Sequence, residues 1–408
     1  MDGGCANKNP CMLNISSLLL GLALAAAPAF AQRDLGVVDV NGGGKTLPVR
    51  VSADSGELNT LAQRAFGSHG RYHVVASGFL YDIRFSLVSP TSVRVDISRP
   101  GGGVISSELV PGANARNALL RAADVAVEKT NGLGLKGYFA SKLVFIGQAT
   151  GHDEVYTGDL FFGNVRRMTS DRAFALSPRW SPDGGRVLYT SYYHHGFPDV
   201  FLMNFADNQR TTFESFKGTN SGARFSPDGE HVAMVLSGEG TTEIYLSDAQ
   251  GRRVTRLTRR DSVKSSPCFS PDGSRIVFAS GEGSHPQLYV MSAQGGGMQR
   301  ISFGLSSYCA EPDWSRGNPN RIAYTIGVGA NHYQTAVLDF SKHESVQVSK
   351  APFDAIEPCW LPDGRHLVYT ARDRTHSILA ILDSETGKST QISPVSFGPA
   401  LHADVWPR

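Results

Sequence analysis

One short motif occurs three times along the sequence, as Pro178-Arg-Trp-Ser-Pro-Asp-Gly184, Ala223-Arg-Phe-Ser-Pro-Asp-Gly229 and Pro267-Cys-Phe-Ser-Pro-Asp-Gly273. Degenerate copies follow at Pro312-Asp-Trp-Ser-Arg-Gly317 and Pro358-Cys-Trp-Leu-Pro-Asp-Gly364, and a clipped copy lies at Asp404-Val-Trp-Pro407. The aromatic residues of successive copies are 45, 44, 45, 46 and 46 residues apart. A fixed period of this length indicates a repeat architecture, in which each repeat is one supersecondary unit.

Each motif predicts a tight hairpin at the end of a strand. Proline presets φ, aspartate favours an Asx turn, and glycine tolerates positive φ. Segments with strand patterns follow the turn, as in Arg275-Ile-Val-Phe-Ala279, Gln287-Leu-Tyr-Val-Met291 and Gln299-Arg-Ile-Ser302. Four strands per repeat correspond to one blade of a β-propeller.

The two ends of the repeat region complement each other. Residues 142–146, 154–157 and 165–169 have the patterns of the second, third and fourth strands of a blade that lacks its first strand. Residues 403–408 supply that strand, and Trp406 continues the register of the repeat. We therefore predict a six-bladed β-propeller over residues 141–408, closed by the C-terminal strand so that no sheet edge stays open. An open array of sheets is the alternative.

Residues 32–140 carry no repeat and predict a smaller N-terminal α/β domain. Strand patterns cover residues 47–51, 79–88 and 92–98, and residues 56–66 are expected to be helical. A second helix is expected over residues 113–130, because its apolar residues recur on one face and Asn131-Gly132 follows as a stop signal.

The N-terminal 31 residues predict a secretory signal peptide. Their apolar stretch, residues 18–31, is too short to span a bilayer and ends in Ala29-Phe-Ala31, the small-residue pattern of a cleavage site. A retained apolar anchor is the alternative, and Met12 is an alternative start. The net charge of +2, with 19% charged residues, leaves no basic stripe for nucleic acid.

Catalytic and cofactor motifs are not evident, so we expect no enzyme site, cofactor or metal. The G-x-G-x-x-G pattern at residues 132–137 follows a helix and precedes a strand, the reverse of a dinucleotide site. His69 and His73 have no carboxylate or cysteine at ligand spacing. One catalytic alternative stays open, because Glu311 and Glu357 occupy matching repeat positions and could form an acid/base pair.

Partner recognition is expected on one face of the propeller. In each blade, the loop that enters the first strand and the loop between the second and third strands lie on the face opposite the hairpins. These loops are the longer and more variable set, which suits binding. The segment Tyr192-Tyr-His-His-Gly-Phe197 in one of them is either a packed loop or part of a binding rim. The candidate partner-binding residues on this face are Phe174, Leu176, Thr219, Asn220, Gly222, Lys264, Ser265, Ser266, Tyr308, Glu311, Ile356 and Glu357.

The export signal, the α/β domain and the six blades together resemble the TolB family, the periplasmic component of the Tol-Pal system of bacteria with an outer membrane. Residues 127–146, Val-Glu-Lys-Thr-Asn-Gly-Leu-Gly-Leu-Lys-Gly-Tyr-Phe-Ala-Ser-Lys-Leu-Val-Phe-Ile, are similar to the family's junction between the helix and the first blade. The α/β domain is shorter than is usual in the family, and the fourth turn lacks Pro-Asp-Gly.

The resemblance implies a monomeric periplasmic protein that binds proteins and supports outer-membrane integrity and cell division. Its expected partner is the peptidoglycan-associated lipoprotein Pal, and the family's partner-sensitive positions correspond to Thr219, Gly222 and Ser265. The segment that corresponds to residues 32–40 contacts the inner-membrane protein TolA and switches between docked and free states. An ordinary first strand of the α/β domain is the alternative for this segment. A generic propeller with another partner and a propeller-associated hydrolase are the alternatives for the whole chain.

Overall fold

The computed structural model describes residues 37–38, 46–302, 304–329 and 331–407. Residues 1–31, for which the sequence predicts a signal peptide, lie outside the described residues, as does most of the segment 32–40. Arg33–Arg408 form one compact unit. Within the described residues, no helix is both long enough and apolar enough to cross a membrane.

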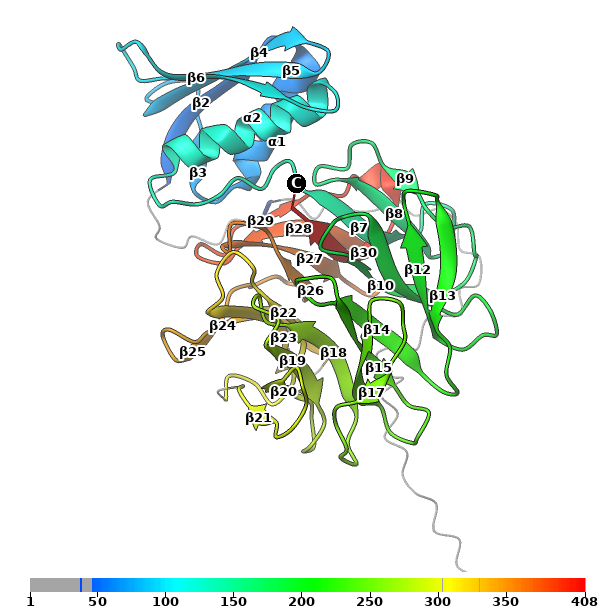
Figure 1. Cartoon of the computed structure of the whole chain (residues 1–408). Helices are drawn as coiled ribbons and strands as arrows, with labels where there is room; N and C mark the ends of the chain where they lie inside the picture. The colour runs from blue at the N-terminus through cyan, green and yellow to red at the C-terminus, as the bar shows by residue number, and fades with distance from the viewer. Residues whose placement is uncertain (1–36, 39–45, 303, 330, 408) are drawn as a thin grey trace, which may run out of the picture. The chain divides into compact units, whose positions relative to one another are not determined.

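Six antiparallel sheets form the predicted propeller (Figure 1), and each contains four propeller strands, which in blade 1 come from the two ends of the repeat region. The first strands of neighbouring blades contact one another around the ring. The six-bladed β-propeller expected from the repeat is thereby confirmed. From first to fourth strand, the blades are blade 1, β30 (Ala400–Trp406), β7 (Lys142–Gly147), β8 (Glu154–Asp159) and β9 (Arg166–Arg167); blade 2, β10 (Ala175–Trp180), β11 (Arg186–Ser191), β12 (Asp199–Asn204) and β13 (Gln209–Glu214); blade 3, β14 (Asn220–Phe225), β15 (His231–Leu236), β16 (Glu243–Asp248) and β17 (Thr255–Arg256); blade 4, β18 (Lys264–Phe269), β19 (Arg275–Ser280), β20 (Gln287–Ser292) and β21 (Gln299–Arg300); blade 5, β22 (Cys309–Trp314), β23 (Arg321–Gly329), β24 (His332–Asp339) and β25 (Glu344–Gln347); and blade 6, β26 (Asp354–Trp360), β27 (His366–Arg372), β28 (Ser377–Asp383) and β29 (Ser389–Gln391).

The Ser-Pro-Asp-Gly motif closes the hairpin between the first and second strands of a blade. In blade 2, Ser181 donates its backbone N–H to Arg186 O at 2.8 Å, and Gly184 donates to Ser181 O at 2.9 Å. The Asp183 carboxylate accepts from the Ser181 hydroxyl and from Gly185 N, and Gly184 takes a φ of 67°. The aspartate and glycine therefore have the turn roles that the sequence assigns to them.

The C-terminal strand β30 pairs with β7 and completes blade 1. The register differs from the prediction by one residue, because Val405 pairs with Leu143 in the way that Trp180 pairs with Val187 in blade 2. Val405 thus takes the place of the repeat's aromatic residue. Trp406 instead packs over Gly184 and donates its indole N–H to Pro182 O at 3.1 Å, so its side chain joins blade 1 to the hairpin of blade 2.

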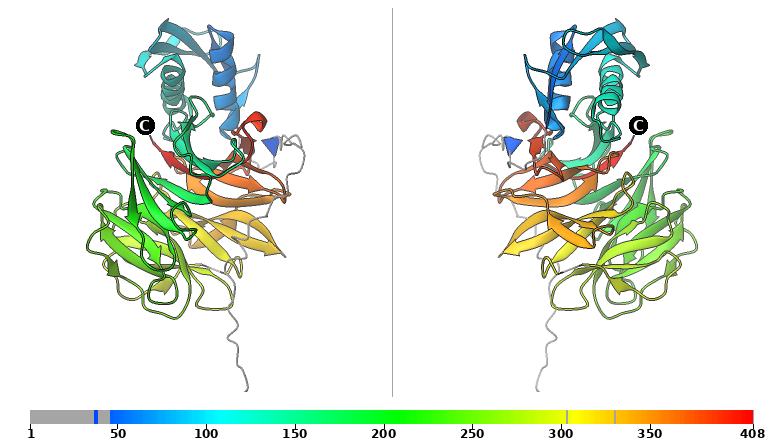
Figure 2. Two further views of the ribbon diagram at one scale, coloured as in Figure 1. Left: turned by 90° about the vertical axis from the view of Figure 1, so that its right-hand side faces the viewer. Right: turned by 90° about the vertical axis from the view of Figure 1, so that its left-hand side faces the viewer.

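The N-terminal region contains one five-stranded sheet and two helices. The sheet order is β3-β2-β4-β5-β6, and helices α1 and α2 pack on one of its faces (Figure 2). Ser55 and Asn114 cap the two helices by accepting from Leu58 N and Asn117 N. The elements are β2 (Leu47–Ala53), α1 (Gly56–Ser68), β3 (Tyr72–Val74), β4 (Tyr81–Ser89), β5 (Ser92–Ser98), β6 (Val104–Pro111) and α2 (Ala115–Thr130).

The short strand β1 (Val37–Val38) belongs to the propeller. It pairs with β29 as a fifth strand on the outer edge of blade 6, with Val37 opposite Thr390 and Val38 opposite Ser389. The sequence alternative, an ordinary first strand of the α/β domain, therefore does not describe these two residues.

Candidate functional site

A ring of six residues surrounds the propeller axis. Each first strand contains a β-bulge, where its register against the second strand shifts. The residue at the bulge has positive φ in every blade, a backbone conformation that favours glycine but is here taken mainly by other residues. This channel ring consists of Ser177, Gly222, Ser266, Glu311, Glu357 and His402, with φ between 52° and 62°.

The channel ring encloses a small chamber of about 70 Å³, to which all six of its residues contribute. Arg179 and Arg224, from the next layer of the channel, also line this chamber. Since a cavity needs about 10–15 Å³ of accessible volume to hold one water, the chamber has room for several waters or for one small charged group. The ring residues are only partly exposed, with 20% of the His402 side chain and 13% of the Glu357 side chain accessible to solvent.

Three titratable side chains meet in the channel ring. Nδ1 of His402 lies 2.9 Å from Oε1 of Glu357, and Oε2 of Glu311 accepts the backbone N–H of Glu357 at 3.1 Å. Hydroxyls of Thr325 and Thr370 donate to Glu311 and Glu357, respectively. Although burial opposes it, the neighbouring His402 lowers the pKa of Glu357 to about 2. Burial, followed by the charge of Glu357, raises the pKa of the Glu311 carboxyl.

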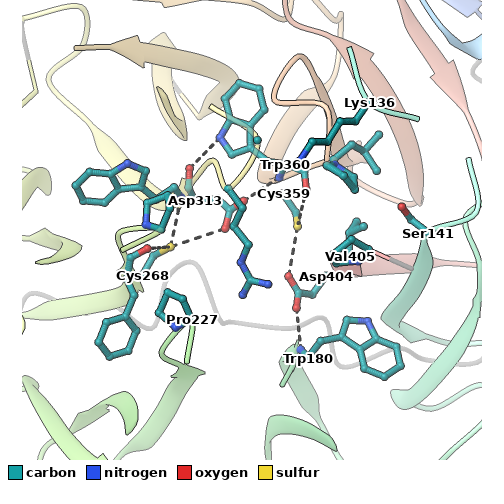
Figure 3. Close-up of a pocket in the computed structure, with 18 of the residues that line it drawn as sticks. Lys136, Ser141, Trp180, Pro227, Cys268, Asp313, Cys359, Trp360, Asp404 and Val405 are labelled. Atoms are coloured by element: carbon teal, nitrogen blue, oxygen red, sulfur yellow. Dashed lines mark hydrogen bonds between the residues drawn. The ribbon is translucent and has the colours of Figure 1, made fainter. Parts of the chain in front are cut away.

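A second layer of side chains fills the channel toward the hairpin face, and we name it the inner layer. It consists of Arg179, Arg224, Cys268, Asp313, Cys359 and Asp404, and part of it is drawn in Figure 3. Nη1 of Arg224 donates to Oδ1 of Asp313 at 2.6 Å, and Arg179 lies 3.9 Å from Asp404. Burial raises the pKa of both thiols, which keeps them protonated and unreactive.

The aspartates of the inner layer also tie neighbouring blades together. Asp404 accepts the backbone N–H of Trp180, and Asp313 accepts that of Trp360, both at 2.8 Å (Figure 3). A cavity of about 340 Å³ lies on the hairpin side of this layer. The carboxylates of the inner layer are already paired with arginines and with backbone N–H groups of neighbouring blades. This layer therefore stabilises the ring of blades.

The sequence-predicted partner residues divide into three groups. Gly222, Ser266, Glu311 and Glu357 lie together in the channel ring. Leu176, Thr219, Ser265 and Tyr308 are half-buried beside it, and Phe174 is exposed. Three others are buried, namely Asn220, Lys264 and Ile356.

Two of the buried residues already have internal partners. The Asn220 amide donates to Phe216 O at 2.7 Å and to Pro198 O at 3.2 Å. Lys264 Nζ donates to Ser262 O at 2.7 Å and lies 3.6 Å from the Glu243 carboxylate. Both side chains therefore hold loops in place, and we leave them out of the binding surface.

Ser177 and His402 are the two ring members that are absent from the candidate residues, and the reason is clear for His402. Aligning the motifs on their aromatic residues places Trp406 against Trp360, which shifts the last repeat by one residue. Aligning Val405 with Trp360 would have brought His402 opposite Glu357. The available signal was Ala403, which occupies the same place as Ala223 in blade 3.

His69 lies near residues of blade 6 and not in a site with His73. Ligand atoms of His69, Asp363 and His366 lie within 4.8 Å of one another, and all three residues are buried. Nδ1 of His366 is 2.6 Å from Asp363, while its Nε2 accepts the Gly70 N–H at 3.2 Å. Both ring nitrogens of His366 are therefore engaged, whereas the buried Nε2 of His69 has no hydrogen-bond partner among the described residues.

A match to a family model over most of the propeller identifies the protein family of this chain. A family model described as the TolB β-propeller domain matches residues 130–400. The chain belongs to this family. The resemblance inferred from the repeat and the junction sequence is thereby confirmed.

Curated relatives and a solved structure agree with this assignment. Tol-Pal system protein TolB of Desulfosudis oleivorans is 38% identical over 126 residues, which cover 31% of this chain and 28% of that protein. Tol-Pal system protein TolB of Anaeromyxobacter dehalogenans is 30% identical over 288 residues, 59% of this chain and 64% of that protein. The chain thus spans 28% and 64% of these relatives' lengths. TolB from Acinetobacter baumannii has the same fold, with a TM-score of 0.78 at 21% identity, covering 91% of this chain and 100% of that one.

Proposed function

We propose that this chain is the periplasmic protein-binding component of a Tol-Pal-like envelope system. In this role it links a peptidoglycan-associated lipoprotein to inner-membrane Tol proteins, and so supports outer-membrane integrity and constriction during cell division. Membership of the TolB family and the names of the relatives support the assignment to a Tol-Pal-like system. The observation that carries the binding role is a cluster of exposed aromatic side chains beside the channel ring.

We call this cluster the aromatic rim, and it consists of Phe174, Tyr193, Phe197 and Phe216. Their exposed fractions are 39%, 43%, 67% and 48%. Phe174 stacks edge-to-face on Tyr192 at 5.5 Å, which joins the first two loops. The Asn220 side-chain amide links the loops of Phe197 and Phe216, because its N–H groups donate to Pro198 O and Phe216 O and its oxygen accepts from Phe216 N. Exposed aromatics held on one face are typical of protein interfaces.

The catalytic alternative finds less support in the same geometry. Glu311 and Glu357 do approach each other, as their repeat positions suggested. However, Glu357 is ion-paired with His402, and the chamber of about 70 Å³ is too small for a sugar ring or a peptide bond with its flanking groups. A carboxylate pair in this setting suits charge recognition better than hydrolysis.

Binding to the lipid-free lipoprotein tests the proposal. Replacing Gly222 and Ser265 with bulky charged residues should weaken binding at least about tenfold, or about 1.4 kcal/mol. Phe197→Ala should weaken binding as well, since it removes the most exposed aromatic of the rim. Ala206→Lys, in the exposed turn between β12 and β13 at the opposite end of the blade, is the control. Equal binding by the parent and the Gly222, Ser265 and Phe197 variants would remove this face from consideration.

A further inference from the structure

The channel carboxylates differ in whether a cation pairs with them. Glu357 pairs with His402, Asp313 with Arg224, and Asp404 with Arg179. Glu311 accepts only from the Thr325 hydroxyl and the Glu357 N–H, and within the described residues no cationic side chain forms an ion pair with it. A carboxylate withdrawn from bulk water without a counter-cation is an electrostatic cost to the fold.

With every group ionised, the charged side chains of the channel ring and the inner layer sum to a deficit of one positive charge. His402, Arg179 and Arg224 give three positive charges, whereas Glu311, Glu357, Asp313 and Asp404 give four negative ones. Arg372 and Tyr308 also act electrostatically on this cluster, but Arg372 is ion-paired with Asp354. One additional cation would therefore make the channel neutral.

The chamber also contains hydroxyl groups that could accept a hydrogen bond but have no donor among the described residues. The side chains of Ser177 and Ser266 line it, and neither hydroxyl has a hydrogen-bond partner in the described part of the chain. Together with the Glu311 carboxylate, they suit a ligand with several N–H donors and no acceptor. A guanidinium or ammonium group has this property and fits a space of about 70 Å³.

We propose that the chamber binds one arginine or lysine side chain, which a protein partner inserts through the channel ring onto Glu311. This inference rests on the proposed function in assigning a protein partner to this face. Insertion would pair the Glu311 carboxylate with a cation and give the Ser177 and Ser266 hydroxyls a hydrogen-bond donor. It would also place a charged side chain at the centre of the interface. Buried arginine anchors of this kind are common at the energetic centre of interfaces.

Titration with acetyl-arginine amide tests the chamber without the partner, with the His402 ring resonances followed by NMR. For a ligand of this size, we expect saturable binding with a dissociation constant of about 1 mM. Glu311→Gln should weaken binding at least about tenfold, and Glu344→Gln, on the exposed strand β25, should leave it unchanged. Acetyl-glutamine amide, which has no charge, should not bind.

A second variant guards against a folding defect in Glu311→Gln. Ser266→Lys places a tethered ammonium in the chamber, so it should abolish binding of acetyl-arginine amide and raise the melting temperature. The proposal is overturned if acetyl-arginine amide gives no saturable shift up to about 100 mM, if a folded Glu311→Gln binds it normally, or if CaCl₂ shifts the resonances and the arginine probe does not. Retained arginine binding with no lipoprotein binding would count against the proposed function alone.

Discussion

The backbone N–H of Gly70 donates to Nε2 of His366 at 3.2 Å, across the junction between the loop after α1 and blade 6. Asp363 engages the other ring nitrogen at 2.6 Å and so holds the imidazole in the tautomer that accepts from Gly70. Because His366 is buried and Gly70 has no side chain, backbone and ring approach closely. This contact fixes the position of the loop between α1 and β3.

Gly70→Ala should destabilise the protein. A Cβ at this position would overlap the carboxylate of Asp383, which is itself held by Arg365 through two hydrogen bonds. Relieving the overlap should cost about 1–3 kcal/mol of the free energy of unfolding. Gly67→Ala is a matched control, since a Cβ there meets no atom within 4 Å and alanine favours the helix. Urea unfolding of both variants provides the measurement, and equal stability of the two would contradict the steric argument.

Deleting residues 403–408 should destabilise the whole propeller. The deletion removes most of the pairing between β30 and β7 and the packing of Trp406 over Gly184. Blade 1 would then expose the edge of β7, and blade 2 would lose the Asp404 acceptor of the Trp180 N–H. We expect aggregation or a large fall in melting temperature by calorimetry. Unchanged melting behaviour would show that the ring does not need its closing strand.

The pair formed by His402 and Glu357 should make stability depend on pH. The pKa of Glu357, about 2 against an ordinary 4.5, means that its contribution is present above pH 4.5 and is lost toward pH 2. The pKa of His402 is raised above its ordinary 6.5 by Glu357, against the effect of burial, so its contribution is complete below pH 6.5 and is lost as pH rises through the raised value. The pair therefore stabilises most between about pH 4.5 and 6.5.

His402→Gln tests this pair. At pH 5.5 the substitution should cost about 2 kcal/mol, because it leaves the largely buried Glu357 carboxylate without its cation. As pH rises from 5.5 toward 9 and passes through the raised pKa of His402, the parent's histidine loses its charge, so the difference between parent and variant should shrink. Urea unfolding at the two pH values measures both quantities. A cost that is the same at pH 5.5 and pH 9 would mean that packing, and not charge, explains it.

The sequence predicted the propeller well because the hairpin motif has a local physical cause. Asp183 and Gly184 fold their own turn, so the motif is visible without tertiary information. The strands β3 and β6 were not predicted. Strand β3 has only three residues, and β6 carries the exposed apolar residues Val104, Ile105 and Leu109, which obscure a two-residue alternation.

The site was predicted only in part, because it is made by contacts between repeats. The motif alignment identified Glu311 and Glu357. It did not identify His402, because Trp406 lies one residue beyond the position of the repeat's aromatic residue and shifts the alignment of the last strand. The roles of Asn220 and Lys264 depend on Pro198 and Glu243, residues about two strands away in sequence. No local pattern distinguishes such a buried anchor from an exposed binding residue.

For the segment 32–40, the sequence suggests a strand that docks reversibly. Val37 and Val38 pair with the outer edge of β29, which belongs to a blade that already has four strands. A variant beginning at Gly42 should therefore keep its melting temperature within about 2 °C, since only one short strand pairing is lost. If the segment carries the inner-membrane contact, the same variant should lose binding to TolA.

A double substitution separates docking from recognition. Val37→Pro with Val38→Pro removes the backbone donors that β1 brings to β29, so the segment should be released while most of its side chains remain. If the docked strand competes with TolA, this variant should bind TolA at least as well as the parent does, whereas the variant beginning at Gly42 should not bind. Calorimetry and a TolA binding assay on the three proteins supply the comparison. Normal TolA binding by the variant beginning at Gly42 would exclude the segment as the contact, and a fall of several degrees in its melting temperature would make β1 a structural strand.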